Sequence, residues 1–156
     1  AVATEMSSAF PAAFEISFSD LVGNPGVPIS NTTDYTSVNL DTTPPVVSNV
    51  VLVSDSSNIG IDDTVTLTFD ISEPIASVSV LIQNTPVYPT CTLSACTATL
   101  DIAIGTRNGP VVLTIQSPVD LAGNTGDAVS QTTNAHSYTV DTIVPSIEQI
   151  SISAIL

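Results

Sequence analysis

The sequence predicts an all-β chain folded as an antiparallel β-sandwich, and three observations support this. Hydrophobic residues make up 43% of the chain but aromatic residues only 4%, with no Trp, so the core must be built from Val, Ile, Leu and Ala. Val, Ile and Thr favour strands because their branched side chains fit a pleated surface. Eleven Pro and seven Gly interrupt the chain at short intervals. Finally, one signature occurs twice, which is typical of tandem domains.

The repeated signature is a turn containing Gly, followed by a linker containing Pro. Asp120-Leu-Ala-Gly-Asn124 leads to Asp141-Thr-Ile-Val-Pro145, and one hundred residues earlier Asp20-Leu-Val-Gly-Asn24 leads to Asp41-Thr-Thr-Pro-Pro45. The two copies align without a gap. We therefore expect residues 1–42 to be the end of one repeat, 43–142 a complete repeat, and 143–156 the start of a third.

The first strands are predicted from alternation. Phe14, Ile16 and Phe18 alternate with polar residues and predict a strand. In the other copy of the repeat, one hundred residues later, the apolar residues of this strand are Leu113 and Ile115, which are out of step with Phe14 and Ile16 by one position. This difference predicts a bulge or a one-residue insertion. The rest of the partial repeat is expected to be a loop over 20–28 and a closing strand at Thr36, Val38 and Leu40.

The linker and the first strand of the complete repeat follow. Pro44 and Pro45 fix φ and remove backbone donors, so the linker after Asp41 should be stiff, and Pro145 marks the same point in the next copy. A strand is expected over 46–53. Its core positions should be Val50 and Leu52, because the next copy has Ile150 and Ile152 there.

The clearest strand of the complete repeat is Thr64–Ile71, where apolar and polar residues alternate strictly. The remaining strands are expected at Val78, Val80 and Ile82, over 87–91, over 96–104 with Ala98, Leu100, Ile102 and Ile104 inward, at Val111, Leu113 and Ile115, and at Tyr138 and Val140. About seven short strands separated by frequent turns are the pattern of an immunoglobulin-like sandwich.

Over nearly its whole length the chain resembles the bacterial immunoglobulin-like repeats found in tandem in large secreted and cell-surface proteins. The motifs that carry the resemblance are Asp63-Thr-Val-Thr-Leu-Thr-Phe69, Ser72-Glu-Pro74, Gly109-Pro-Val-Val-Leu-Thr-Ile115, Asp120-Leu-Ala-Gly-Asn124 and Tyr138-Thr-Val-Asp-Thr-Ile-Val-Pro145. The resemblance implies a secreted or surface protein, and such repeats are more often spacers than domains that recognise a ligand.

The only two cysteines, Cys91 and Cys96, flank Thr-Leu-Ser-Ala, which suits the end of a β-hairpin. A disulfide is favoured over a zinc site, because zinc needs more ligands and the chain has a single His. A disulfide predicts an oxidising, extracellular compartment. No run of about 18 apolar residues predicts a membrane helix. The lack of an initiator Met and of a signal peptide predicts a mature or excerpted chain.

The charge is strongly one-sided, with 15 acidic residues, one Arg, no Lys and a net charge of −14. Almost nothing here can neutralise phosphates, so nucleic acid is excluded as a partner and anionic membranes are disfavoured. We expect no membrane insertion. A negative field of this kind attracts cations instead.

Calcium is the one cofactor that the residue pattern favours. Ca²⁺ takes six to eight oxygen ligands, and candidates are Asp62 and Asp63 in one loop, Asp120 and Asn124 in the signature, and Asp141 in the linker. Loops at one end of a sandwich converge near the interdomain junction, and resemblance to other tandem extracellular sandwiches implies that a cation stiffens it. The alternative is that these residues only form turns by bonding their own backbone.

Catalysis is not expected. His136 is the only candidate base and Arg107 the only cation, and no phosphate-binding loop or metalloprotease pattern occurs. We therefore predict that the chain is not an enzyme. An accessory module of a secreted hydrolase would require a catalytic domain that this sequence does not contain.

The incomplete repeats at both ends raise the question of assembly. A 42-residue tail cannot bury a core of its own, while Ile147, Ile150 and Ile152 mark an apolar strand without a sheet. Either that strand completes the partial domain of another copy, which generates an open fibre, or the sequence is a window cut from a longer repeat protein. The partners are then copies of the chain or neighbouring repeats.

Both readings predict a structural element of an extracellular filament, stalk or adhesin at the cell surface. The alternative is an adhesion module that binds a glycan or a host surface. Such a module would need an aromatic or polar cluster on exposed loops, for which Tyr35 and Tyr88 are the candidates.

Overall fold

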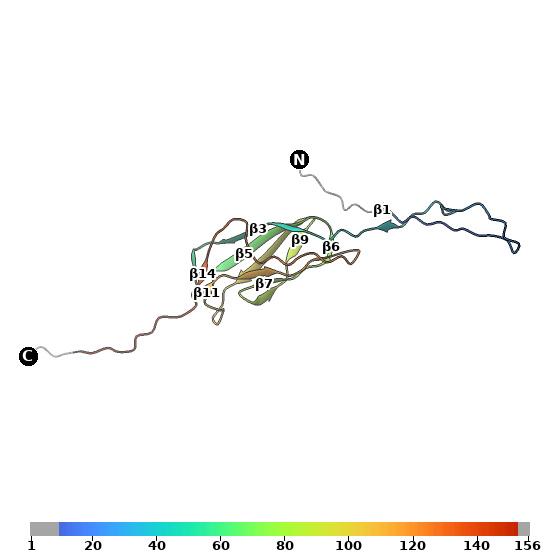
Figure 1. Cartoon of the computed structure of the whole chain (residues 1–156). Coiled ribbons are helices and arrows are strands. Elements are labelled where there is room, and N and C mark those ends of the chain that lie inside the picture. Colours follow the sequence, from blue (N-terminus) through green and yellow to red (C-terminus); the bar gives the residue numbers. More distant parts are fainter. Residues whose placement is uncertain (1–9, 153–156) are drawn as a thin grey trace, which may run out of the picture.

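The computed structural model describes residues 10–152, so parts of the predicted repeats at 1–9 and 153–156 lie outside the described residues. The described chain is all-β, as predicted, and none of its elements is a helix. A central body is flanked by two extended segments that leave it at opposite ends (Figure 1). Nowhere between residues 10 and 152 does the chain form a long apolar helix of the kind that crosses a membrane.

The larger sheet is antiparallel and is built around β5 (Thr64–Ile71). The strand has the bounds that the sequence predicts, and its odd-numbered residues are buried while the alternate threonines and Asp70 are half-buried. On one side β5 pairs with β3 (Val47–Ser54) and on the other with β10 (Ala95–Asp101), which also pairs with β9 (Thr90–Thr92).

A second antiparallel sheet has β7 (Val80–Ile82) at its centre, between β12 (Leu113–Ile115) and β8 (Thr85–Val87). The β7–β8 turn places Gln83 and Asn84 at positive φ (52° and 64°), as a two-residue hairpin of the primed type requires. The buried Gln83 side chain accepts from the Val112 N–H and donates to the Arg107 carbonyl. Its polar atoms are therefore satisfied.

Two small strand groups close the ends of the body. At the end reached by the linker, β13 (Val119–Asp120) pairs with β6 (Ile75–Ser77), with an irregular register between Val119 and Asp120. In the other group, β14 (Thr139–Val140) pairs antiparallel with β11 (Gly109–Pro110) and parallel with β4 (Asn58–Ile59).

The hydrophobic core receives side chains from both larger sheets, which is consistent with a β-sandwich. Its fully buried members include Val50, Leu52, Ile59, Val65, Leu67, Phe69, Ile71, Val80, Ile82, Ala98, Ile102, Ile115 and Val140. The predicted core positions Val50 and Leu52 are confirmed. The prediction for Ile104 is wrong, because β10 ends at Asp101 and Ile104 lies 80% exposed in a turn closed by a bond from Thr106 N–H to the Ala103 carbonyl.

The segment of residues 14–40, here called the N-terminal segment, lies outside this body. Its end is paired only within the extension, where β2 (Asn39–Leu40) and β1 (Phe10–Pro11) form a two-stranded sheet of their own. A bridge joins Ile16 to Ile29, whereas in the body Ile115 is bridged to Val129. These bridges differ by one residue on the first strand only, as the parity of the sequence predicts.

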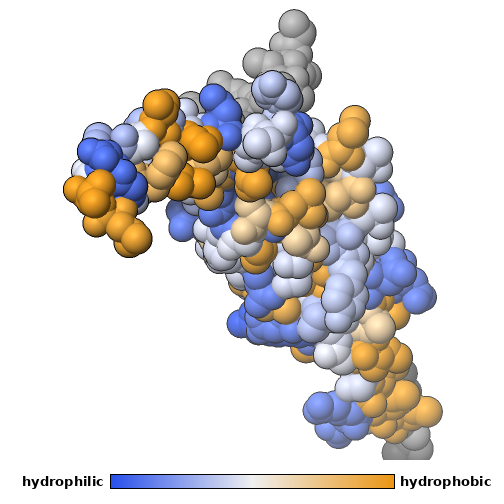
Figure 2. Space-filling model, turned by 90° about the vertical axis from the view of Figure 1, so that its right-hand side faces the viewer, coloured by the Kyte–Doolittle hydropathy of each residue, from blue (hydrophilic) through white to orange (hydrophobic). Residues whose placement is uncertain are grey.

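Both extended segments expose apolar side chains, and hydrophobic patches are visible on the molecular surface (Figure 2). In the N-terminal segment the exposed residues include Phe14, Ile16, Phe18, Val27, Ile29, Val38 and Leu40. In residues 143–152, here called the C-terminal segment, they are Ile143, Val144, Ile147, Ile150 and Ile152. The strand predicted at 147–152 is not formed in the described chain.

The predicted disulfide between Cys91 and Cys96 is confirmed. The two residues face each other in the β9–β10 hairpin, with Cys96 buried and Cys91 exposed. The turn between them has Leu93 at φ 57°. The disulfide therefore links β9, the edge strand of the larger sheet, covalently to β10.

Removing the disulfide should destabilise the body modestly. The loop it closes is short, so the chain-entropy model gives a loss of about 2 kcal/mol in the free energy of unfolding. Urea unfolding of the Cys91→Ser/Cys96→Ala variant, compared with the oxidised chain, measures this loss. An unchanged free energy would show that the hairpin is held by its strand pairing alone.

Candidate metal centre

Asp120 organises the signature loop. The backbone N–H groups of Ala122 and Asn124 donate to its Oδ1 (2.8 Å each), and the Asn124 amide donates to its Oδ2 (2.8 Å). Gly123 has φ 94°, a conformation that favours glycine and lets the chain turn back toward the carboxylate. The turn-forming role that the sequence allows for these residues is therefore present.

The environment of Asp120 keeps it ionised although the residue is only 2% exposed. Burial acts to raise its pKa, but hydrogen bonds from the Asn124 side chain and from the loop backbone outweigh it, so the pKa of Asp120 is lowered. A buried carboxylate that remains charged requires hydrogen bonds or a counter-charge. The loop supplies the hydrogen bonds.

The same loop holds the linker. The Asn124 amide, besides bonding Asp120, donates to the backbone carbonyl of Asp41 (3.1 Å). Two residues further on, Gly126 packs so closely on the backbone of the buried Pro45 that a Cβ at this position would collide with the Pro45 carbonyl oxygen. The linker therefore contacts the body at Asp41 and again at Pro45.

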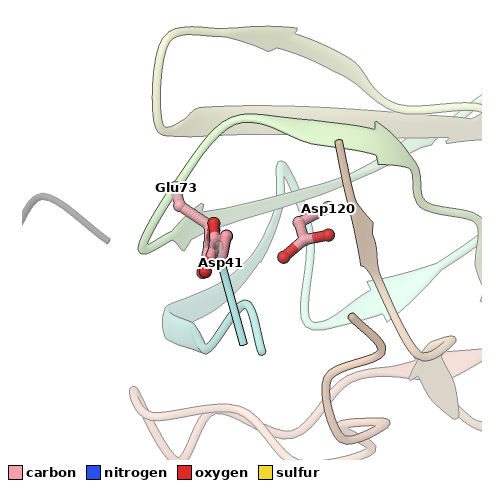
Figure 3. A group of neighbouring side chains, drawn as sticks. All are labelled: Asp41, Glu73 and Asp120. Atoms are coloured by element: carbon pink, nitrogen blue, oxygen red, sulfur yellow. The ribbon is translucent and has the colours of Figure 1, made fainter. Parts of the chain in front are cut away.

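Three carboxylates meet at this junction, from Asp41, Glu73 and Asp120 (Figure 3). Asp41 belongs to the linker, Glu73 to the turn that follows β5, and Asp120 to β13. One oxygen of each lies within 4.8 Å of one of each of the others. Because β13 pairs with β6 directly after the Glu73 turn, the sheet register brings the latter two together.

Glu73 is the unusual member of this group. Its side chain is 8% exposed and points at Asp41 (Figure 3), and it accepts no hydrogen bond from residues 10–152. Burial, followed by the negative charges of Asp41 and then Asp120, raises the pKa of Glu73. A buried carboxylate without a donor is costly unless it is neutralised by a proton or by a cation.

The donor set suits a hard divalent cation. All three ligands are carboxylate oxygens, the type that Ca²⁺ and Mg²⁺ prefer, with no sulfur or imidazole nearby in the described cluster. Two oxygens that bind one Ca²⁺ at its usual distance of about 2.4 Å are at most about 5 Å apart, and the spacing here satisfies that limit. The cluster could thus hold a metal ion, with water completing the coordination.

The structure divides the predicted calcium ligands between two places. Asp120 lies in the cluster, and Asn124 donates a hydrogen bond from its side-chain amide to the Asp120 carboxylate. Asp62, Asp63 and Asp141 are not part of it. Asp63 precedes β5 and Glu73 follows it, so the eight residues of the strand place them about 25 Å apart.

At that other end the acidic residues have local partners. Asp63 accepts the Gly60 N–H through Oδ2 (2.7 Å), and Asp62, at φ 72°, donates its N–H to the Ile102 carbonyl. Asp141 accepts the Ile143 N–H (2.9 Å) just as Asp41 accepts that of Thr43 (3.0 Å). The linker prediction for Asp41 and Asp141 thus has a shared local geometry.

Glu73 was not among the predicted ligands, although Ser72-Glu-Pro74 is one of the motifs of the resemblance. Its turn position gave no reason to expect burial. Only the topology could have predicted the burial of Glu73, because the turn after a long central strand must cross the end of the sandwich where the linker enters. The remaining candidates lie elsewhere, with His136 exposed beside Asn134 and Tyr138, and Arg107 exposed in the turn before β11.

Comparisons of the chain with protein-family models, with curated proteins and with solved structures found no match. The function therefore has to be inferred from the geometry of the junction.

Substituting Gly126 by Ala should loosen the linker. The new methyl group would collide with the Pro45 carbonyl, which is backbone and cannot rotate away, so overpacking costs about 1–3 kcal/mol. Thermal unfolding measures the loss. Gly60→Ala is the matched control, because Gly60, like Gly126, does not have a positive φ, but a Cβ there meets only the Asp63 carboxylate at an ordinary contact distance of 3.8 Å. Equal losses in both variants would trace the effect to backbone conformation and not to the linker contact.

The pH dependence of stability should reveal Glu73. Its pKa is raised on folding, so its contribution is fully present below the pKa of the unfolded chain and is lost as pH rises through the folded value. In chelator, Glu73→Gln should therefore match the wild type at acid pH and become more stable than it toward neutral pH. Urea unfolding from pH 3 to pH 8 tests this, with the exposed Glu148→Gln as control. A Glu73→Gln variant that is less stable than the wild type at neutral pH would contradict the expectation.

Proposed function

We propose that this chain is a structural part of an extracellular stalk, filament or adhesin, in which immunoglobulin-like sandwiches follow one another and a Ca²⁺ ion at each junction fixes their orientation. The observation that carries the proposal is the origin of the three carboxylates. Asp41 comes from the linker, whereas Glu73 and Asp120 come from the body. A cation bound by all three is a cross-link between a domain and the segment that enters it.

The junction is stiff in part without the ion. Pro44 and Pro45 restrict the linker backbone, Asn124 bonds the Asp41 carbonyl, and Gly126 receives Pro45. Without a cation, however, three carboxylates in close proximity repel one another. The ion changes this repulsion into attraction, so cation binding should decide whether the junction is rigid or loose.

Calcium is favoured over magnesium by the surroundings. Magnesium demands near-ideal octahedral geometry and keeps most of its water, while calcium tolerates irregular sets of carboxylates. Extracellular modules bind Ca²⁺ with dissociation constants of about 10⁻⁴–10⁻³ M, so a site with few protein ligands is adequate there. The Cys91–Cys96 disulfide supports an oxidising compartment of that kind.

The remaining features support a mechanical role. The net charge of −14 attracts cations and keeps neighbouring molecules apart. The extended segments leave the body at opposite ends, as expected of a domain within a linear array (Figure 1). For the alternative adhesion module, the exposed Tyr35 and Tyr88 would have to act together, but they lie in the N-terminal segment and between β8 and β9 respectively.

Calcium should stabilise the body through this site. At a free Ca²⁺ concentration of about 100 times the dissociation constant, binding to the folded state adds about 2.7 kcal/mol to the free energy of unfolding. Glu73→Gln should lose most of this gain while being more stable than the wild type in chelator. Thermal and urea unfolding with and without Ca²⁺ measure both effects, and Glu148→Gln should behave as the wild type.

The shape of the chain provides a second, independent test of the cation at the junction. Small-angle scattering should show a more extended and less variable particle in Ca²⁺ than in chelator, and the difference should disappear in Glu73→Gln. Calcium that stabilises the wild type and Glu73→Gln equally would place the ion elsewhere and overturn the proposed junction.

A further inference from the structure

A groove opens beside β12, where the strand pairing is interrupted. Ile115 exchanges two backbone hydrogen bonds with Val129 (2.7 and 2.9 Å), and the Val111 N–H donates to the Tyr138 carbonyl (2.9 Å). Along the chain, four positions separate Val111 from Ile115, but nine separate Val129 from Tyr138. The facing segment therefore leaves β12 between these two points and bounds a groove of about 560 Å³. This volume is typical of small-molecule sites.

The facing segment leaves β12 because it crosses to the larger sheet. Thr133 donates to the Val50 carbonyl through its N–H (2.7 Å) and its hydroxyl (2.9 Å), and the Asn134 amide donates to the Leu52 carbonyl (2.9 Å). Val50 and Leu52 belong to β3. The groove thus lies where this segment bridges the two sheets, and the buried core residues Leu52 and Leu113 line it.

Leu113 has a backbone donor and a backbone acceptor on the side of the groove. Backbone groups of alternate residues in a strand point the same way, so the Leu113 N–H and carbonyl face the same side as those of Val111 and Ile115. Gln116, which is out of phase with them, donates instead to the Ser79 carbonyl across the sheet. Within residues 10–152 neither backbone group of Leu113 has a partner, although the residue is only 7% exposed. Such groups require a partner.

His136, which also lines the groove, is held in one orientation and one tautomer. The Asn134 side-chain nitrogen bonds the Leu52 carbonyl, which can only accept, and lies 3.2 Å from His136 Nδ1. An amide nitrogen only donates, so Nδ1 is the acceptor and the neutral ring carries its proton on Nε2. This arrangement leaves Asn134 Oδ1 buried without a partner among the described residues. Unpaired groups of this kind are concentrated at functional sites.

The remaining polar groups of the groove are neutral. Ser130, Gln131 and Thr132 contribute hydroxyl and amide groups, and the Tyr138 ring lies edge-to-face with His136, with ring centroids 6.2 Å apart. No Asp, Glu, Lys or Arg is among the described residues that line the groove, although the chain has a net charge of −14. A charged ligand would therefore find no counter-charge here, so the groove suits an uncharged ligand with several hydrogen-bonding groups.

The same excursion occurs in the N-terminal segment, but the imidazole does not. There the Ala12 N–H donates to the Val38 carbonyl (2.8 Å) and Ile16 pairs with Ile29, so four and nine positions again separate the two bonds. Thr36 stands where the body has its imidazole. The donor set described above is therefore specific to the body.

We propose that the groove of the body binds a neutral sugar residue of a glycan. Two adjacent hydroxyl groups of a sugar can accept from the Leu113 N–H and donate to the Leu113 carbonyl, while further hydroxyls bond His136 Nε2–H and the Gln131 amide and the ring lies against Tyr138. None of the three junction carboxylates lines the groove, so the site goes beyond the proposed function and is independent of it.

An extended peptide fits the groove less well than a sugar. The backbone bonds at Val111 and Ile115 close both ends of the interruption and lie about 13 Å apart along the strand. A peptide strand that paired with Leu113 would have to continue through one of these bonds. A compact ring needs only the single interrupted position.

Titration of the isotope-labelled chain with the methyl glycosides of glucose, galactose and mannose, followed by NMR, tests the site. At least one glycoside should shift the Leu113 amide and the His136 imidazole signals. The dissociation constant should be about 1 mM, because a single sugar makes few contacts. The tetra-O-methyl derivative of methyl glucoside has the same ring but no hydroxyl donors, and it should shift neither signal.

Two variants test the side chains of the groove. His136→Phe keeps an aromatic ring beside Tyr138 but removes the Nε2–H donor, and Gln131→Ala removes the amide. Each should weaken binding by up to about tenfold, the value of one hydrogen bond. Both residues are exposed, so thermal unfolding should be unchanged. Tyr88→Ala is the control, because Tyr88 is an exposed aromatic residue that does not line this groove.

Each other outcome would overturn part of this inference. Unshifted Leu113 and His136 signals with all three glycosides would eliminate the sugar site. Equal shifts with the methylated derivative would show that the groove binds apolar rings and not hydroxyl groups. Shifts caused by N-acetyl-Ala-Ala-amide, but by no glycoside, would assign the groove to a peptide. The calcium response of Glu73→Gln is measured separately, so either proposal can fail while the other stands.

Discussion

The junction depends on the hydrogen bonds that the signature loop donates to the buried Asp120 carboxylate. They fold the loop around a charge and keep that charge ionised, because they lower the pKa of Asp120 against the effect of burial. The folded loop then presents Asn124 to the Asp41 carbonyl and Gly126 to Pro45. Local turn formation and linker recognition are thus two consequences of one set of bonds. An Asp-x-x-Gly-Asn sequence can therefore form a turn and also take part in a site.

Glu73 is the element of this arrangement that folding alone does not explain. A glutamine at this position would bury no charge, yet the chain places a third carboxylate beside two others and gives it no donor among the described residues. Buried polar groups without partners are uncommon in native proteins and are concentrated where a ligand or a switch supplies the missing interaction. In the proposed function that interaction is the cation, which would offset the burial and the neighbouring negative charges that raise the pKa of Glu73.

The sequence predicted local structure better than it predicted the site. β5 has the predicted bounds because strict alternation fixes a strand that is buried on one face, and the one-residue shift between Ile16 and Ile115 followed from parity. The acidic cluster was predicted only in part, because residues near loops cannot be assigned to one end of a sandwich without its topology. Asp62 and Asp63 precede β5 and Glu73 follows it, so a single strand separates two of the predicted candidates from the cluster member that was not predicted. Ile104 failed for a related reason, since alternation does not show where a strand ends.

A site shared between a linker and a domain has a consequence for any chain of such units. Asp41 stands before the body and Asp141 stands after it, each with a hydrogen bond from the residue two positions later. Each unit would therefore complete the site at its own entry and supply one carboxylate to the site of the next. A pull along the chain would act on every ion through the linker residue that binds it, so loss of one ion would loosen one junction and leave the sandwich on either side folded. In the proposed function, stiffness is a property of the junctions, and it follows the calcium concentration while the fold of the domains does not.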